Sequence, residues 1–474
     1  MNKRILICNR GEIAIRIAKA VSELGGTAIG FYTDFEKEPA HLEYCQEWIY
    51  LSGTTNLETY LNQDKIIELA QKSKADAIHP GYGFLSENPS FADKVKETGI
   101  IFIGPHAQAI HSMGDKAVSK KIAKDAGVPV VPGSVGKIDT INEAKDIAKN
   151  IAYPVLLKAV AGGGGKGMRV CNNDEELEKF FPAVQREAKS SFGNPDLLVE
   201  KYIVNPHHIE VQILANNKGD VFHLYERECS IQRRHQKVIE EAPSPFIGSD
   251  EKTRQNICET AVKLARHVQY DSAGTVEFIM GEDKSFYFLE MNTRIQVEHP
   301  ITEEITNIDL MVNMIKSAFD MDLDFKSQED IQIRGHAIEL RICAEDSETM
   351  LPSPGMIENY DYELGKGIRF DHCLRPNREI SSNFDPMVGK LVARGFDRSV
   401  AIRKVRNALN KLNILGLKTN IPLLKVILAE ETFQAGQYTT FYIDKIKPQE
   451  NLNLNITPQE LLIHAIEKEI GLTN

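Results

Sequence analysis

The sequence predicts an α/β protein of three domains: an N-terminal parallel sheet, a central domain with a glycine-rich lid, and a C-terminal α+β domain. The first observation is length, because 474 residues exceed the roughly 100–200 residues of one domain. The second is the alternation of short apolar runs with helical patterns in the first hundred residues. The third is a run of four glycines between two strand-like segments.

The N-terminal region, residues 1–114, is predicted to form a Rossmann-like sheet. Its strand-like runs are KRILIC, TAIGFY, DAIHP and IIFIGP. Helical patterns near residues 13–24 and 65–73 lie between them, and strands that alternate with helices are typical of parallel sheets. The segment CNRGEIAIR after the first strand lacks the G-x-G-x-x-G fingerprint. We therefore expect no dinucleotide site on this sheet.

The central region, residues 115–330, is expected to open with a helix at about residues 114–126. A Gly-Val-Pro break follows, and the strand YPVLLKAV then leads into the glycine run. We expect a lid at about residues 131–203. From the glycine run to about Met291 the sequence favours strands.

The C-terminal region, residues 331–446, contains the strand-like runs HAIELRIC and KLVARG and an amphipathic helix near residues 400–412. We expect the three regions to be separate domains that share one cleft. Residues 447–474 indicate a polar linker and a short helix, because Thr457, Pro458 and Glu460 supply an N-cap, a first-turn proline and a capping-box acid. That helix is a candidate for docking a partner subunit.

Charge and cysteine content restrict the classes of function. A net charge of −11 disfavours binding to nucleic acid or an anionic membrane, because such partners select for basic surfaces. The seven cysteines are scattered without a C-x-x-C pair, which indicates reduced thiols. The N-terminal apolar run is too short for a signal peptide, and no run approaches the roughly 18 apolar residues of a membrane span. We expect a cytoplasmic protein.

The glycine run has two equally weighted interpretations. Its residues are Gly162, Gly163, Gly164, Gly165, Lys166, Gly167 and Met168, with strand-like sequence on both sides. Backbone N–H groups without side chains can approach phosphate oxygens closely, and Lys158 and Lys166 add positive charge. The segment is therefore either a phosphate-binding lid or an ordinary surface hairpin.

Two glutamates on neighbouring strand-like segments predict a metal site. A four-residue turn at residues 282–285 would place Glu277 opposite Glu290, with Asn292 on the same face. Like charges directly opposed across strands destabilise a hairpin unless a hard cation such as Mg²⁺ binds both. The alternative is a solvated acidic pair, which the apolar neighbours disfavour: these are Val276, Phe278, Phe288 and Leu289.

Two polar segments and one isolated arginine add further candidates. Residues 292–300, NTRIQVEHP, combine amide, guanidinium and carboxylate groups, and residues 228–237, ECSIQRRHQK, supply a basic counterpart. Arg341 lies inside the apolar strand HAIELRIC. Taken singly, each feature fits a structural role, since an arginine in such a strand usually forms an ion pair.

Together these segments resemble the biotin carboxylase family of the ATP-grasp superfamily, from Ile7 to about Tyr442. The first half of the family is matched by NRGEIAIR, HPGYGFLSEN, FIGP, MGDK and AGVPVVPG. The catalytic half is matched by KAVAGGGGKGMRV, RRHQKVIEEAP, EMNTRIQVEHP and GHAIELRICAED. Agreement at so many ordered places does not arise by chance.

The resemblance implies ATP-dependent carboxylation of the N1′ nitrogen of biotin on a carrier protein, with bicarbonate first phosphorylated to carboxyphosphate. Glu298 would deprotonate bicarbonate. Arg341 and Arg294 would stabilise the enolate-like biotin anion, a role that suits a group that stays protonated. The residues that the resemblance assigns to bicarbonate and biotin are Tyr82, Lys237, Arg294, Gln296, Val297, Glu298 and Arg341.

The resemblance also implies ATP with Mg²⁺ or Mn²⁺. Glu277 and Glu290, helped by Asn292, would bind the metal ion. The residues assigned to ATP are Lys116, Lys158, Gly162, Gly163, Gly164, Gly165, Lys166, Gly167, Met168, Glu200, Lys201, Ile203, His208, Gln232, His235 and Glu277. Lysines, backbone amides and a metal ion suit phosphoryl transfer, which chiefly needs positioning and charge neutralisation.

Three departures from the family pattern matter. Lys166 stands where the family also uses arginine, and Asn383-Phe384 stands where tyrosines are common, which leaves the contacts of that loop open. The biotin-accepting sequence Ala-Met-Lys-Met is absent. We therefore expect a separate carrier protein and a carboxyltransferase as partners, and the resemblance implies a homodimer.

The main interpretation is the biotin carboxylase of a multisubunit enzyme, with acetyl-CoA as the first choice of acceptor and pyruvate or propionyl-CoA next. One alternative is another ATP-grasp ligase that joins a carboxylate to an amine, which Arg341 and the RRHQK segment disfavour. The other is a nucleotide-binding subunit without catalysis, which retention of Glu298, Lys237 and Arg341 disfavours.

Overall fold

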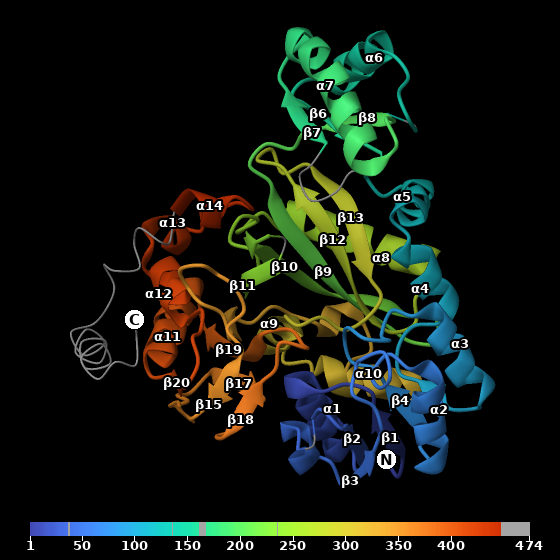
Figure 1. Cartoon of the computed structure of the whole chain (residues 1–474), viewed down its shortest axis with the longest axis vertical. Coiled ribbons are helices and arrows are strands. Elements are labelled where there is room, and N and C mark those ends of the chain that lie inside the picture. Colours follow the sequence, from blue (N-terminus) through green and yellow to red (C-terminus); the bar gives the residue numbers. More distant parts are fainter. Residues whose placement is uncertain (37, 135, 161–166, 235, 447–474) are drawn as a thin grey trace.

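The structure is a computed structural model that describes residues 1–36, 38–134, 136–160, 167–234 and 236–446. Several predicted residues lie outside the described ones, as does the expected terminal helix: they are Gly162, Gly163, Gly164, Gly165, Lys166 and His235. Figure 1 shows an N-terminal lobe at the bottom, a small lid at the top and a C-terminal lobe at the side of a large central sheet. The predicted α/β class is confirmed.

The N-terminal lobe is a five-stranded parallel sheet in the order β3-β2-β1-β4-β5, as the alternating pattern predicted. The helix α1 follows β1 at once, and its buried Ile13, Ile17 and Val21 recur at helical spacing. The elements are β1 (Arg4–Ile7), α1 (Gly11–Glu23), β2 (Thr27–Tyr32), η1 (Ala40–Tyr44), β3 (Glu47–Tyr50), α2 (Gln63–Lys72), β4 (Ala77–His79), α3 (Pro89–Glu97), β5 (Ile101–Phe102) and α4 (Ala107–Gly114).

The lid is a three-stranded antiparallel sheet in the order β7-β6-β8, packed against two helices. It follows α5 (Lys116–Asp125), which begins where Asp115 caps the backbone N–H groups of Ala117 and Val118. The lid elements are α6 (Ile141–Ile151), β6 (Val155–Ala159), β7 (Met168–Cys171), α7 (Asp174–Phe192) and β8 (Leu197–Lys201).

Two helices correct the expectation of mainly strands between the glycine run and Met291. They are α7 and α8 (Glu251–His267). The capping side chains of Asn173 and Asp250 begin α7 and α8, and acidic residues follow in each first turn. These start signals favour helix over strand, and they outweigh the apolar runs nearby.

The central sheet has eight antiparallel strands in the order β13-β12-β9-β10-β11-β14-β19-β17. They are β9 (His207–Ala215), β10 (Val221–Arg233), β11 (Gln236–Ala242), β12 (Ala273–Met280), β13 (Phe286–Asn292), β14 (His336–Cys343), β17 (Ile368–His372) and β19 (Met387–Gly395). The pairing of β11 with β14, in which Ile239 lies opposite Leu340, carries the sheet across residue 331. The domain divide expected there stays a prediction.

The C-terminal lobe packs helices against β14 and β19 around buried Leu340, Leu391, Val405 and Leu424. Two more helices, α9 (His299–Thr306) and α10 (Leu310–Ala318), connect the central sheet to it, with η2 at Gln328–Asp330. Its own elements are β15 (Gly355–Ile357), β16 (Asn359–Asp361), β18 (Arg378–Ile380), α11 (Arg398–Asn410), β20 (Asn413–Leu415), α12 (Ile421–Ala429), α13 (Glu431–Gln434) and α14 (Tyr442–Ile446).

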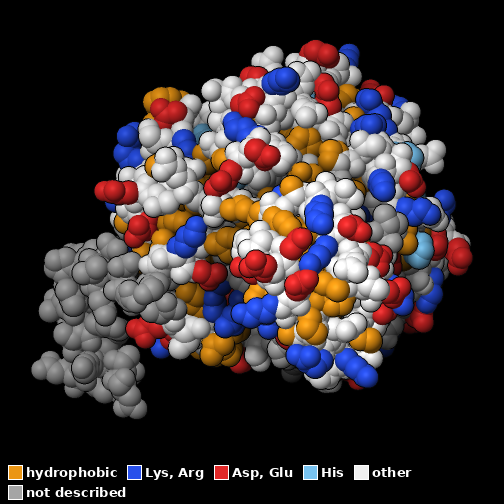
Figure 2. Space-filling model, turned by 90° about the horizontal axis from the view of Figure 1, so that it is seen from above, with side chains coloured by type: hydrophobic (Ala, Val, Ile, Leu, Met, Phe, Trp, Pro, Cys, Tyr) orange, Lys and Arg blue, Asp and Glu red, His pale blue; other side chains and the backbone are white. Residues whose placement is uncertain are grey.

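The surface mixes charges of both signs. Figure 2 shows acidic and basic side chains interspersed over the upper face, with hydrophobic side chains between them. Among the described helices, none combines the length and apolar character that a bilayer crossing needs.

Candidate active site

Two opposed carboxylates stand on the hairpin of β12 and β13, as predicted. Glu277 on β12 pairs directly with Glu290 on β13, and Asn292 lies two residues further along the same face. The Asn292 side chain donates a hydrogen bond from Nδ2 to Glu277 Oε1 at 2.9 Å. The sequence pattern therefore located this group of oxygen-bearing side chains correctly.

The hairpin reaches this register by a different route from the predicted one. Its loop spans five residues, 281–285, and a bulge at Leu289 then restores the pairing of Glu277 with Glu290. Leu289 is 40% exposed, so the expectation that it packs into the protein is wrong; a bulged residue is left unpaired and turns outward here. The other apolar neighbours are buried as expected: Val276, Phe278 and Phe288.

The two carboxylates differ in how they are neutralised. Burial alone would raise the pKa of Glu277, but Lys237 and His208 outweigh it and hold that pKa well below its usual range. Burial, and then the charge of Glu277, raise the pKa of Glu290. Among the described residues, the Glu290 carboxylate has no hydrogen-bond or ion-pair partner. Lys116, His208 and Lys237 oppose this rise only in part, and such a carboxylate opposite a second one fits a divalent cation.

Lys237 on β11 joins three buried carboxylates. Its Nζ lies 2.5 Å from Glu210 Oε2 and 2.9 Å from Glu277 Oε1. The same atom lies 2.6 Å from Glu298 Oε1. Burial would lower the pKa of this ammonium group, but the carboxylates raise it well above its usual range. Lys237 is therefore a fixed positive charge at the centre of the site.

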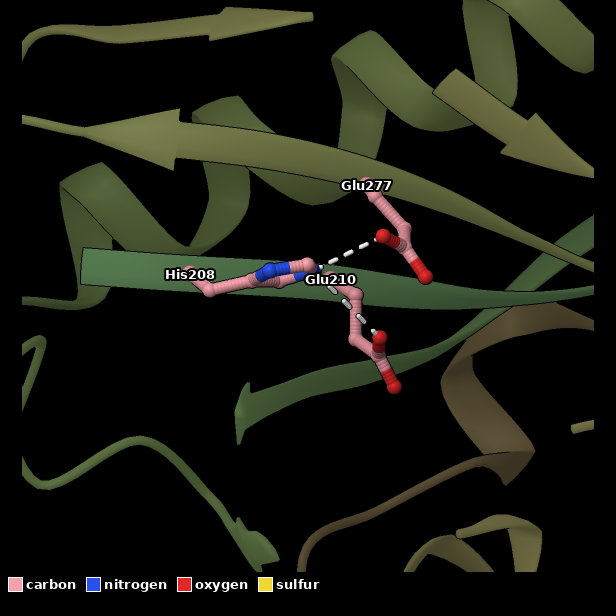
Figure 3. A group of neighbouring side chains, drawn as sticks. All are labelled: His208, Glu210 and Glu277. Atoms are coloured by element: carbon pink, nitrogen blue, oxygen red, sulfur yellow. Dashed lines mark ion pairs between the residues drawn. The ribbon is translucent and has the colours of Figure 1, made fainter. Parts of the chain in front are cut away.

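His208, Glu210 and Glu277 lie close together on the neighbouring strands β9 and β12, as Figure 3 shows. The His208 Nε2 atom lies 2.8 Å from Glu277 Oε2 and 3.9 Å from Glu210 Oε2. Three such ligand atoms within 4.8 Å could hold a metal ion. However, Lys237 already forms ion pairs with both of these glutamates, whereas Glu290 forms none with the described residues.

Glu210 and Arg227 belong to the site but were not predicted from the sequence. Arg227 on β10 is fully buried, and its Nε lies 2.5 Å from Glu210 Oε1. Its remaining donors reach Gln212, Thr275, Gln296 and Thr302. The full set of acceptors matters because a buried, unpaired charge is strongly destabilising. The sequence signal was one glutamate in the mainly apolar β9 and one of several charged residues in β10, which alone does not identify a site.

Glu298 and Arg341 complete the charged network. Glu298 is 1% exposed and directly precedes α9. Arg341 on β14 lies with Nη2 2.9 Å from Glu298 Oε2 and with Nε 2.5 Å from Glu240 Oε1. Burial alone would raise the pKa of Glu298, but Lys237, Arg341 and Arg227 hold it well below its usual range. The Glu298 carboxylate is thus ionised and closely compensated.

The segment between β13 and α9 is fixed by hydrogen bonds. Arg294 donates to Glu87 Oε2 at 2.8 Å and to Asn292 Oδ1 at 2.9 Å. Gln296 is buried, accepts from Arg227 and donates to Glu277 Oε1 at 2.7 Å. Gln296 therefore links Arg227 to the Glu277 carboxylate and fixes the position of that carboxylate.

A cavity of about 500 Å³ lies beside the charged network, between the N-terminal and C-terminal lobes. Five of the seven residues predicted for bicarbonate and biotin line it: Tyr82, Lys237, Arg294, Val297 and Arg341. The other two, Glu298 and Gln296, are buried behind its wall. The Tyr82 hydroxyl donates to Glu12, which also lines the cavity.

The unusual Asn383-Phe384 pair stands at the rim of this cavity. The Phe384 ring centroid lies 3.7 Å from the Arg10 guanidinium carbon, and the ring packs with Phe35, Tyr60 and Phe84. The Asn383 carbonyl accepts from Asn56 Nδ2 at 3.1 Å. The loop is therefore fastened to the N-terminal lobe, and phenylalanine makes these contacts without contributing a hydroxyl group.

The residues predicted for the nucleotide fall on the lid and on the central sheet. On the lid, Lys158 Nζ lies 2.6 Å from Glu200 Oε2, and Lys120 of α5, which was not predicted, lies 2.8 Å from Glu200 Oε1. Lys201 instead donates to the carbonyls of Ala152 and Tyr153.

On the central sheet, Gln232 of β10 contacts His208 of β9, with Nε2 and Nδ1 2.8 Å apart. Met168 begins β7, which pairs with β6. The two strands that the sequence predicted therefore flank residues 161–166. The other described candidates are exposed Lys116 at the start of α5, buried Gly167 before β7 and half-buried Ile203 after β8.

Three family models match successive parts of the chain. "Biotin carboxylase, N-terminal domain" matches residues 1–110, and "Carbamoyl-phosphate synthase L chain, ATP binding domain" matches residues 115–326. "Biotin carboxylase C-terminal domain" matches residues 339–445. The matches therefore extend over all three lobes.

Individual proteins agree with these matches. The biotin carboxylase of Halalkalibacterium halodurans is 46% identical over 94% of this chain and 97% of its own length. A pyruvate carboxylase subunit from Methanothermobacter thermautotrophicus is also 46% identical, over 94% of this chain and 90% of its own. The biotin carboxylase domain dimer of Hydrogenobacter thermophilus 2-oxoglutarate carboxylase, solved with MgADP, ADP and bicarbonate, has a TM-score of 0.83, is 47% identical and covers 95% of this chain and 98% of its own.

Proposed function

The chain belongs to the biotin carboxylase family, and from that premise we propose that it carboxylates biotin on a carrier protein, using bicarbonate and ATP through carboxyphosphate. The observation that carries this proposal is the convergence of Lys237 and Arg341 on Glu298 at the wall of one cavity. The opposed Glu277 and Glu290 adjoin the same network. A base, fixed cations and a metal site in one network suit both half-steps of the reaction.

ATP and Mg²⁺ are the proposed phosphoryl donor and metal ion, supported by the MgADP present in the related structure. Glu277 and Glu290, with Asn292, would hold the ion, since the Glu290 carboxylate forms no ion pair with the described residues. When bound, Mg²⁺ neutralises phosphate oxygens during phosphoryl transfer. Lys116 and Lys158 would meet the phosphates on the lid side.

Bicarbonate would bind against Lys237 and Arg294 at the cavity wall. Without it, the cations around Glu298 depress the pKa of that carboxyl, which makes it a weak base. An anion beside Lys237 would share its positive charge, so the pKa of Glu298 would rise on substrate binding. The bicarbonate proton then passes to Glu298 while a bicarbonate oxygen attacks the γ-phosphorus of ATP, and ADP leaves.

Biotin would occupy the part of the cavity lined by Tyr82, Arg294 and Arg341. Its ureido nitrogen is a poor nucleophile, and a permanently charged guanidinium stabilises negative charge on the ureido oxygen. The N1′ nitrogen forms a bond to the carboxyl carbon, phosphate leaves, and the N1′ proton passes to that phosphate.

Purified protein supplied with ATP and Mg²⁺ tests this function. We expect ADP release that depends on bicarbonate and rises with free biotin, together with acid-labile fixation of labelled bicarbonate. ADP release that needs an amine instead of bicarbonate would indicate another ATP-grasp ligase. Nucleotide binding without turnover would indicate a non-catalytic subunit.

For the complete enzyme we propose a biotin carrier protein and a carboxyltransferase as partners, and a homodimer of this chain. The dimer is supported by the related domain dimer, and the partner proteins by relatives named as subunits of larger carboxylases. All seven cysteines are free, which favours a reducing cytoplasm.

Acetyl-CoA is the proposed acceptor, followed by pyruvate and propionyl-CoA, although relatives of similar identity serve pyruvate and 2-oxoglutarate carboxylases. The tagged chain should be isolated from its own cells with its partners and assayed with each acceptor. Carboxylation of pyruvate or propionyl-CoA in preference to acetyl-CoA would contradict the first choice.

A further inference from the structure

Lys390 is a fully buried lysine in the middle of β19, and the roles proposed above do not use it. It lies directly opposite Arg341 in the β14–β19 ladder, so both side chains project from the same face of the sheet. Two like charges opposed in this way destabilise a sheet unless each has its own acceptors. Arg341 has Glu240 and Glu298.

The acceptors of Lys390 belong to two separate segments of the cavity wall. Its Nζ donates to the backbone carbonyl of Val297 at 2.8 Å and lies 3.2 Å from Glu12 Oε2. The other oxygen of Glu12 accepts from the Tyr82 hydroxyl. Glu12, Tyr82 and Val297 line the cavity, whereas Lys390 lies behind them. One buried ammonium group therefore contacts Val297, on the side proposed for bicarbonate, directly. It contacts Tyr82, on the side proposed for biotin, through the Glu12 carboxylate.

We propose that Lys390 is a positioning residue that sets the bicarbonate and biotin positions relative to each other. This inference rests on the function proposed above. On one side, the Val297 carbonyl and the Glu298 N–H share a peptide plane, so the lysine fixes the backbone from which the Glu298 side chain extends. On the other side, it keeps Glu12 available as the acceptor that orients the Tyr82 hydroxyl.

The environment of Glu12 shows why a cation is needed there. Burial raises the pKa of this carboxyl, and Lys390 opposes the rise. Without the lysine, Glu12 would take up a proton or remain as an unpaired buried charge. In either state the hydrogen bond from Tyr82 changes, and the biotin wall of the cavity loses its fixed geometry.

The test compares Lys390→Met, Glu12→Gln and the double variant in bicarbonate- and biotin-dependent ADP release. For Lys390→Met we expect KM for bicarbonate and for biotin each to rise at least tenfold, while KM for ATP stays within twofold. Glu12→Gln should raise KM for biotin more than KM for bicarbonate. The double variant removes the Glu12 carboxylate that Lys390→Met leaves without its cation, so its melting temperature should recover relative to Lys390→Met while KM for bicarbonate stays high.

Lys404→Met is the matched control, because Lys404 also donates to a backbone carbonyl, that of Arg394 at 2.7 Å, but does not line the cavity. We expect its KM values to match the wild type. Recovery of both KM values in the double variant would show a purely structural role and overturn the inference, as would KM values within twofold in Lys390→Met. If Lys390→Met does not fold, the double variant decides. Wild-type protein without bicarbonate-dependent turnover would instead contradict the proposed function.

Discussion

Single side chains at this site act through the charges that surround them. Glu298 lies 2.6 Å from Lys237 Nζ and 2.9 Å from Arg341 Nη2, so its basicity depends on what else those cations bind. Glu290, opposite Glu277, has no such partner among the described residues. The carboxylates of Glu298 and Glu290 are chemically alike but differ in their neighbours. That difference separates the proposed base from the proposed metal ligand.

Glu298→Gln keeps the shape of the side chain and removes its ability to accept a proton. We expect bicarbonate-dependent ADP release to fall by about 10²–10⁴-fold, the usual contribution of a general base. Nucleotide affinity should change little, because the residue does not lie on the lid. Steady-state assays and nucleotide titration measure both quantities. Glu363→Gln, an exposed surface change, is the control, and equal turnover in the two variants would remove Glu298 as the base.

Glu290→Gln separates a metal site from a solvated acidic pair. Removal of a like charge opposed across strands should stabilise the metal-free protein by roughly 0.2–1 kcal/mol, seen as a small rise in melting temperature in EDTA. The Mg²⁺ concentration for half-maximal activity should rise at least tenfold. A variant with an unchanged Mg²⁺ requirement would show that Glu290 does not hold the ion.

The sequence was most informative where several residues of one motif agreed. The opposed Glu277 and Glu290 were predicted from strand periodicity alone, and the cavity residues Lys237 and Arg341 only through the family resemblance. Neither strand periodicity nor the family resemblance identified Glu210, Arg227 or Lys390. Each lies inside a strand, and its partners come from other strands and loops, so no local pattern marks it.

At the scale of elements, β10 and its neighbours are joined by the buried Arg227. Its guanidinium reaches β9, β12, α9 and the segment after β13. The bulge at Leu289 has a similar effect on β13, because it returns Glu290 to the face of Glu277 after a longer loop than predicted. Loop length and bulges compensate each other here, which periodicity cannot reveal.

Arg227→Met should leave Glu210 with Lys237 as its remaining cation and several buried acceptors unpaired. Breaking a buried ion pair from one side typically costs about 3–5 kcal/mol. We therefore expect a clear fall in the midpoint of urea unfolding and in activity, measured by circular dichroism and ADP release. Arg186→Met, at an exposed position of α7, is the matched control. Equal midpoints in both variants would contradict the bracing role.

At the scale of the whole molecule, the central and C-terminal parts share one sheet, and the N-terminal and C-terminal lobes share one cavity. The prediction of a parallel N-terminal sheet was correct because alternating strands and helices have a local signature, whereas the glycine run lies outside the described residues. The continuity of the central sheet across residue 331 was not predicted, since the pairing of β11 with β14 joins residues about a hundred positions apart in the sequence. Such pairing depends on tertiary packing.

Buried histidines make the folded protein sensitive to acid. Burial lowers the pKa of His41 to about 4, of His79 to about 3, and of His223 and His372 to about 4. Unfolded histidine binds a proton near pH 6.5, so the unfolded state binds more protons between these values. The stability that the neutral histidines contribute is fully present above about pH 6.5 and is lost as pH falls through the folded pKa values.

His41→Gln isolates one such contribution. The wild type should lose about 3 kcal/mol from this residue as pH falls from 6.5 to 4, at about 1.4 kcal/mol per pKa unit, and the variant should not. Melting temperatures between pH 4.5 and 7.5 should therefore fall less steeply in the variant. The exposed His111→Gln serves as control, and parallel curves for wild type and His41→Gln would contradict the assignment.

The unbroken central sheet also decides where this chain can be divided. A cut at residue 331 would leave β11 on one fragment and β14 on the other. Each fragment would then have an unpaired strand edge, because Ile239 of β11 pairs with Leu340 of β14 in the intact sheet. Neither fragment would hold both Glu298 and Arg341. Catalysis would return only when the two fragments associate and β11 pairs with β14 again. A chain split at this position would therefore report the association of two proteins fused to its fragments.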